Sequence, residues 1–282
     1  MTEFTTLHPY DPLFVARYVA AIKGAMAPGD LLPGAPDWAE REIARAQSGY
    51  TRAGDGGEAG ANAVSYSLAR LLGATEPVFF VPGLGFTQLE AKVDRGIGML
   101  LRPPSRLFTD AGLEMAAARA MPIRLDASGG LMGGAVIPPA LTPRFRDHLE
   151  QRMDRLARRL AEAEMDAPAC IGILLEAATY AAERGLGLYE AADAVAPGVA
   201  ESYPPGLRLV APDRKRLDRA LRQRLEEASR PPREPGLLAR MMGRGTRGKE
   251  AENGRRWGGN SDVTPPPERA PAPDSAPPSL EE

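Results

Sequence analysis

Cysteine, histidine and aromatic residues are scarce in this sequence, and each shortage excludes a class of site. Cys170 is the only cysteine among 282 residues, so neither an intrachain disulfide nor a zinc site of four cysteines is possible. The two histidines, His8 and His148, lie far apart in sequence, and no carboxylates stand in a recognisable ligand spacing. We therefore predict no metal site. Aromatic residues make up only 6% of the chain, which favours alanine-rich helices that pack small side chains.

The sequence also lacks a complete motif for nucleotide binding or acyl transfer. Four glycines fall within 129–134, but the next segment ends in Pro138 and Pro139 and cannot be the helix that a phosphate loop requires. The segment 80–85 resembles the strand and loop that build the oxyanion hole of α/β-hydrolases, but no Gly-x-Ser-x-Gly follows it. No cofactor and no particular reaction are predicted.

Long apolar runs are missing as well. The N-terminus has no basic segment followed by an apolar one, and the longest apolar stretch, 167–182, is interrupted by Glu176. We therefore expect a soluble, cytoplasmic protein. Within that stretch we expect Cys170 to be buried and Glu176 to lie on a polar face of a helix.

The pattern of apolar residues indicates an α+β fold that is mostly helical, with a small β-sheet from the middle third. Helical spacing, capping residues and glycine stops predict helices over 12–24, 36–49, 59–72, 86–95, 110–120, 142–165, 167–184, 187–196 and 212–229. Short apolar runs predict strands over 78–81, 97–101, 121–126 and 134–137. Residues 1–229 are expected to form one globular body, in which 1–75 is helical, 76–140 is mixed and 141–229 is again helical.

The remaining segment, 230–282, has the composition of a disordered tail, because it is rich in proline, glycine and charge. One short apolar motif, 235–243, interrupts it. If this motif forms a helix on contact, its apolar side chains make one compact face beside an arginine. These docking residues are Leu237, Leu238, Arg240, Met241 and Met242. A groove on a protein partner, an anionic membrane surface and the protein's own body are the three targets that fit.

The net charge of −2 is unevenly distributed. The segment 214–256 carries 14 Lys and Arg against six Asp and Glu, whereas the residues before and after it are acidic. This basic segment could contact nucleic acid, an anionic membrane, an acidic protein or its own acidic body. No Tyr, Phe, His or Trp occurs in 204–256, which argues against base stacking. Its leucines, Leu217, Leu221 and Leu225, predict a helix that packs on the body.

A set of arginines in the middle third is the candidate ligand site. Guanidinium groups bind carboxylate or phosphate in a bidentate manner, and a serine hydroxyl adds a donor. We therefore predict a small-anion pocket within 96–137, with an aspartate orienting one arginine; ordinary surface arginines are the alternative. The candidate residues are Arg102, Ser105, Arg106, Arg119, Arg124 and Asp126.

These features together favour a non-catalytic cytoplasmic interaction or assembly protein. Its body would bind a protein partner or a second copy of itself, and the tail motif would add a second contact that raises avidity. The first alternative is a small anion-binding protein or enzyme that uses the arginine set. The second alternative is non-specific contact with nucleic acid through 214–256.

Overall fold

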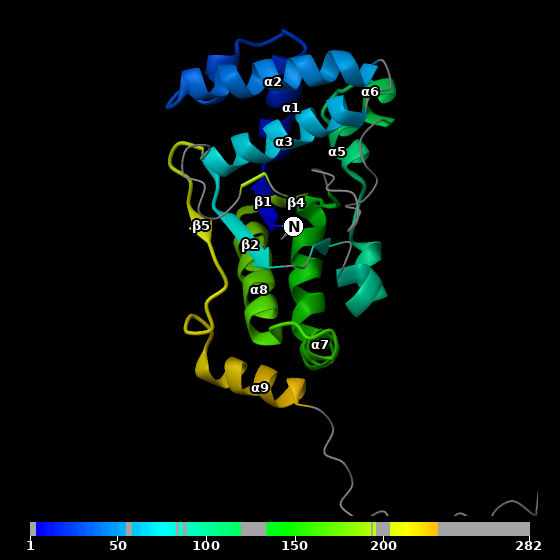
Figure 1. Cartoon of the computed structure of the whole chain (residues 1–282), viewed down its shortest axis with the longest axis vertical. Coiled ribbons are helices and arrows are strands. Elements are labelled where there is room, and N and C mark those ends of the chain that lie inside the picture. The colour runs from blue at the N-terminus through cyan, green and yellow to red at the C-terminus, as the bar shows by residue number, and fades with distance from the viewer. Residues whose placement is uncertain are drawn as a thin grey trace, which may run out of the picture. The chain divides into compact units, whose positions relative to one another are not determined.

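The computed structural model describes residues 4–54, 58–82, 85–86, 89–119, 134–192, 194–195 and 204–230 (Figure 1). The chain divides into two units, Met1–Pro231 and Pro232–Glu282, and all described residues belong to the first. The tail motif 235–243 lies outside the described residues.

The described residues confirm the α+β class. One mixed five-stranded sheet runs in the order β3-β4-β1-β2-β5, and only the β2–β5 pair is parallel. The strands are β1 (Phe4–Tyr10), β2 (Val78–Pro82), β3 (Val136–Ile137), β4 (Gly187–Ala192) and β5 (Leu209–Val210). The expectation that the middle third supplies this sheet is corrected, because the central strand β1 comes from the N-terminus and β4 and β5 follow residue 186.

Helices cover both faces of the sheet: α1, α2 and α3 lie on one side, and α7 and α8 on the other (Figure 1). The α-helices are α1 (Pro12–Ile22), α2 (Pro36–Gly54), α3 (Glu58–Thr75), α5 (Pro104–Asp110), α6 (Met115–Arg119), α7 (Thr142–Glu162), α8 (Ala167–Arg184) and α9 (Arg219–Ser229). Shorter 3-10 turns occur at Pro28–Leu31, Arg95–Met99 and Pro139–Leu141, and a π-helical turn occurs at Leu89–Val93. None of the described helices combines the length and apolarity needed to cross a membrane.

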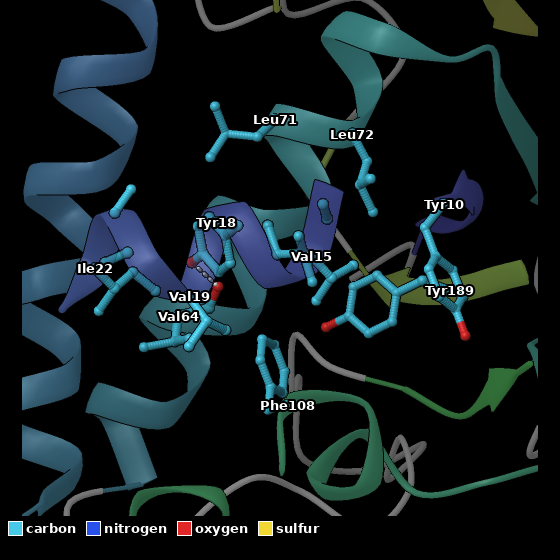
Figure 2. Close-up of a cluster of buried hydrophobic side chains, with 14 of the residues drawn as sticks. Tyr10, Val15, Tyr18, Val19, Ile22, Val64, Leu71, Leu72, Phe108 and Tyr189 are labelled. Atoms are coloured by element: carbon cyan, nitrogen blue, oxygen red, sulfur yellow. Dashed lines mark hydrogen bonds between the residues drawn. The ribbon is translucent and has the colours of Figure 1, made fainter. Parts of the chain in front are cut away.

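Alternation of side chains along the strands divides the core into two clusters. Leu7 of β1 and Leu188 of β4 face α7 and α8, whereas Tyr10 and Tyr189 face the helices of the N-terminal half. Figure 2 shows the second of these groups, with both tyrosine rings beside the apolar side chains of α1 and α3. The sheet is thus buried on both faces, and its strands are correspondingly apolar.

One hydrogen bond joins α1 to α3 inside that cluster. The hydroxyl of Tyr18 donates to the carbonyl of Val64 at 2.7 Å, as the dashed line in Figure 2 marks. Tyr18 is fully buried, and burial raises the pKa of its phenol well above the ordinary value. The neutral phenol therefore satisfies its donor without exposing the ring.

The best-predicted helices begin at side chains that cap the first turn or end at a glycine in a left-handed conformation. Asp11 caps α1 by accepting from the N–H of Leu13 at 2.9 Å, and Asp166 caps α8 by accepting from Ala169 at 3.2 Å. Gly185 ends α8 with a φ of 65°, a left-handed conformation that glycine adopts without strain. The predicted helices 12–24, 36–49, 59–72, 142–165 and 167–184 are confirmed, with differences of a few residues at their ends.

Some predicted elements differ from the structure in type or extent. The strand predicted over 97–101 is replaced by a 3-10 helix, Arg95–Met99, since Asp94 caps it by accepting from the N–H of Gly96 at 3.0 Å. The helix predicted over 187–196 is instead β4, which pairs along its whole length with β1. Of the helix predicted over 110–120, only Met115–Arg119 is helical as α6, because α5 ends at Asp110 and the chain turns at Gly112, whose φ is 91°. The helix predicted over 212–229 begins only at Arg219, as α9.

Candidate anion-binding pocket

Arg102 is placed at the edge of the sheet by its own main chain. Its N–H donates to the carbonyl of Val136 and its carbonyl accepts from the N–H of Val136, both at 2.8 Å. The next two residues, Pro103 and Pro104, have no N–H to continue the pairing, and Pro104 begins α5 instead. Arg106 therefore lies in the first turn of that helix, close to Arg102 in sequence and in space.

Both arginines line a single small cavity. Its volume is about 150 Å³, and its walls come from the end of β1, the first turn of α1, β3 and α5. Most of the lining is apolar, and the ionisable groups are Arg102, Arg106, Asp110 and Tyr10. The apolar lining residues are Pro12, Val15, Leu107, Ala111, Val136, Pro138 and Pro139. The cavity thus combines an apolar interior with a few charged side chains, as ligand sites commonly do.

The two guanidinium groups differ in whether a carboxylate of the protein neutralises their charge. Arg106 pairs with Asp110 one turn along α5, with Nε and the carboxylate 3.1 Å apart. Among the described residues, the Arg102 guanidinium donates only through Nη1, to the carbonyls of Met99 at 3.0 Å and Leu101 at 2.7 Å. No described acid lies within salt-bridge distance of Arg102, so its positive charge is not neutralised by the residues that the structure describes. The lining therefore holds two guanidinium groups against one carboxylate.

Tyr10 closes the cavity where β1 ends. Its ring lies against Gly187 so closely that a Cβ at position 187 would collide with it, which explains the glycine there. Burial, and secondarily the negative charge of Asp110, raise the pKa of Tyr10 well above its ordinary value. Its phenol therefore stays protonated at neutral pH and is available as a hydrogen-bond donor.

The structure brings together two of the predicted site residues, Arg102 and Arg106. Ser105 is half-buried in α5 and does not line the cavity. Arg119 ends α6, and the position of its side chain is not described. Arg124 and Asp126 lie outside the described residues, as do the tail residues of the docking motif. Tyr10 belongs to the site without having been predicted, because its place depends on the pairing of β1 with β4.

The described stretch of the basic segment 214–256 contacts the body. Arg214 pairs with Asp166 at 2.8 Å, Arg224 pairs with Asp154 at 2.7 Å, and Arg216 lies 3.8 Å from Glu176. The exposed Glu176 and the buried Cys170 lie as the sequence predicted, and burial raises the pKa of the Cys170 thiol to about 11. Carboxylates on α7, on α8 and at the N-cap of α8 thus pair with three arginines of the basic segment, which reduces the positive charge left for nucleic acid.

A polar cluster between α7 and the segment before α5 was not predicted. The Asp94 carboxylate, whose side chain is 3% exposed, accepts from His148 Nε2 at 2.9 Å and from Arg152 Nη1 at 3.3 Å. Burial alone would raise the pKa of Asp94, but hydrogen bonds from Gly96 and His148 and the charge of Arg152 together lower it. The spacing of His148 and Arg152, one turn apart on a helix, was the only signal in the sequence.

Three comparisons bear on the identity of the chain. No protein-family model, no curated protein and no solved structure matches it. Within the described residues, no group of three histidine, cysteine, aspartate or glutamate side chains is placed to hold a metal ion.

Proposed function

We propose that this protein binds a small carboxylate, with the anionic group at Arg102 and Arg106 and the apolar part in the cavity beside them. The observation that carries this proposal is the unneutralised guanidinium of Arg102 on the wall of a mostly apolar cavity. Hydrogen bonds between a guanidinium and a carboxylate are charge-assisted and stronger than neutral ones.

The size and the lining of the cavity favour a carboxylate over a larger or more polar anion. A cavity of about 150 Å³ holds a ligand of roughly the size of benzene. A short branched or aromatic carboxylic acid matches this volume and places a single charge at the polar side. The protonated phenol of Tyr10 supplies a further donor in the lining of the same cavity.

The test is thermal unfolding of the full-length protein with benzoate or isobutyrate, each compared with its neutral amide. At about 100 times Kd, a ligand that binds only the folded state adds about 2.7 kcal/mol to its stability. The melting temperature should therefore rise by roughly 5–10 °C with the carboxylate. The amide should produce a much smaller rise, because it cannot form the charge-assisted pair.

Variants then locate the effect. Arg102→Ala and Arg106→Ala should each remove most of the carboxylate-dependent rise while the unliganded protein still folds. Arg219→Ala is the matched control, since Arg219 is exposed at the start of α9 and makes no hydrogen bond or ion pair with described residues. Two results would contradict anion recognition at this pocket. One is an equal rise in melting temperature with the acid and with its amide, and the other is an equal loss of that rise in the Arg219 variant.

Docking of a protein partner through the tail is a second candidate function, favoured by the apolar motif 235–243 in otherwise polar surroundings. The pair Leu237→Asp and Met241→Asp should abolish co-purification of a partner that the unaltered full-length chain retains at moderate salt. Retention of the partner by the double variant would reject the docking role.

We also place the protein in the cytoplasm, a location that its single, buried free cysteine suits.

A further inference from the structure

A second concavity, unlike the carboxylate pocket, lies along α7. Its volume is about 500 Å³, and its lining is predominantly polar. One wall is α7 and the other is the segment of short helical turns before α5. The ionisable residues that line it are Glu90, Asp94, Arg95, Arg152, Arg155 and Arg159.

The arginines on α7 share one side of that helix because of their spacing. Arg152, Arg155 and Arg159 follow one another at three and four residues, which places them along one stripe. The neighbouring positions Leu149 and Leu156 are buried in the core below. The stripe therefore borders the packed face of α7, and Arg95 approaches it from the opposite wall.

Two of these four arginines form ion pairs with acidic residues of the same chain. Arg152 donates to Asp94 at 3.3 Å, and Arg159 pairs with Glu162 at 3.2 Å. The side chains of Arg95 and Arg155 make no hydrogen bond or ion pair with any residue that the structure describes. Two exposed guanidinium groups on opposite walls thus line the same concavity without carboxylate partners among the described residues.

Asp94 keeps the third arginine in place. Its carboxylate is almost fully buried and accepts at once from the N–H of Gly96, from His148 and from Arg152. These contacts tie the wall before α5 to the wall formed by α7. The two oxygens of this one carboxylate accept from all three donors, so the protein orients the Arg152 guanidinium before any ligand arrives. This preorganisation lowers the entropy cost of binding an anion.

We propose that this concavity binds a phosphate group, held by Arg95 and Arg155 from opposite walls with Arg152 as a further donor. A phosphate has several acceptor oxygens and up to two negative charges, so it can bind more than one guanidinium at a time. A polar lining suits it, whereas the apolar carboxylate pocket does not. The volume exceeds that of the phosphate itself, so the ligand class includes small phosphomonoesters as well as the free ion.

The experiment is calorimetric titration of the full-length protein, at low ionic strength, with inorganic phosphate and separately with glycerol 3-phosphate. Arg95→Gln and Arg155→Gln should each weaken binding of the better ligand about tenfold or more. Arg158→Gln is the matched control, because Arg158 is an exposed arginine of the same helix that does not line the concavity and has no partner among described residues. It should leave affinity unchanged within about twofold.

Further comparisons distinguish a phosphomonoester from free phosphate as the ligand, and this concavity from the carboxylate pocket as the binding site. Tighter binding of glycerol 3-phosphate than of inorganic phosphate would identify a phosphomonoester as the ligand, and the reverse order would identify the free ion. Retention of phosphate binding in Arg102→Ala would show that the two sites are independent. The proposal is overturned if neither ligand binds at millimolar concentration, if the Arg158 variant loses as much affinity, or if only a short single-stranded oligonucleotide binds.

Discussion

At the scale of the residue, His8 illustrates how a polar side chain is held neutral inside the sheet. The hydroxyl of Thr6 donates to the carbonyl of Ala191 at 3.1 Å, so its oxygen must accept from His8 Nε2, which lies 2.8 Å away. The proton of the imidazole is therefore on Nε2. Nδ1 is buried and has no hydrogen-bond partner among the described residues, so a proton added there would have no acceptor.

Protonation of His8 should therefore destabilise the fold. Burial lowers the pKa of His8 from 6.5 to about 3, so below pH 6.5 the unfolded chain binds a proton that the folded chain does not. Stability is complete above that pH and should fall by up to about 1.4 kcal/mol per pH unit between 6.5 and about 3. The check is urea unfolding of the unaltered protein and of His8→Gln across this range. Parallel curves for the two proteins would contradict the assignment.

At the scale of the element, α9 shows whether apolar packing or ion pairing attaches a surface helix to the body. Leu225 is fully buried, and Leu217 and Leu221 are partly buried against the core cluster of α7 and α8. The ion pair between Arg214 and Asp166, just before the helix, is about half-exposed. Exposed ion pairs contribute about 0–1 kcal/mol, whereas a buried leucine contributes several times as much. The leucine stripe should therefore dominate.

Substitutions in and beside α9 test that ranking. Leu225→Ala should lower the free energy of unfolding by about 2–5 kcal/mol, since it leaves a cavity against α7 and α8. Arg214→Ala should lower it by less than about 1 kcal/mol. Both values come from denaturant unfolding, and hydrogen exchange of α9 shows whether the loss is local. A larger effect from Arg214→Ala would mean that charge, rather than apolar packing, attaches the helix.

Elements of the fold were predictable where local signals and tertiary contacts agree. The helix α8 has its cap at Asp166, proline in its first turn and a left-handed Gly185 at its end, and its predicted bounds were correct. The strand β4 carries Leu188, Glu190, Ala191 and Ala192, four residues of types that favour a helix. Pairing with β1 along six positions outweighed that weak preference, and no local signal indicated it.

At the scale of the whole molecule, Glu190 joins segments that are distant in sequence. Its carboxylate is fully buried in β4 and accepts from the N–H of Phe86 and, at 2.9 Å, from the N–H of Ala135. A Cβ at Gly85 or Gly134 would collide with the same side chain, so both glycines are needed for its close approach. One side chain thus connects β4 to the chain after β2 and to the chain before β3.

The substitution Glu190→Gln should therefore destabilise the whole body rather than one loop. An amide nitrogen in place of one carboxylate oxygen would face a backbone N–H, and hydrogen bonds to charged groups contribute about 1.5–3 kcal/mol each. We expect the free energy of unfolding to fall by at least that amount in urea titrations. Glu183→Gln on the exposed end of α8 is the control and should change little. Equal stability of the two variants would show that the carboxylate is dispensable.

The candidate site was predictable only to a limited extent, for a reason that Arg102 and Tyr10 make plain. The sequence alone places Arg102 and Arg106 near one another, because Pro103 and Pro104 separate them by one short turn. It cannot place Tyr10, almost a hundred residues earlier, in the lining of the same cavity. Likewise, it cannot bring Arg95 to face Arg155, since that approach depends on Asp94 joining two segments.

By itself, the sequence determined the α+β class, the bounds of the long helices and the residue types available for binding anions, since periodicity, caps and glycine stops act within a few neighbouring residues. Only the tertiary structure decided that an N-terminal strand lies at the centre of the sheet. At Pro9, β1 is paired with β4 but not with β2, so the missing N–H is tolerated there. Strand pairing and side-chain convergence act between distant residues, and a single sequence carries no local signal for them.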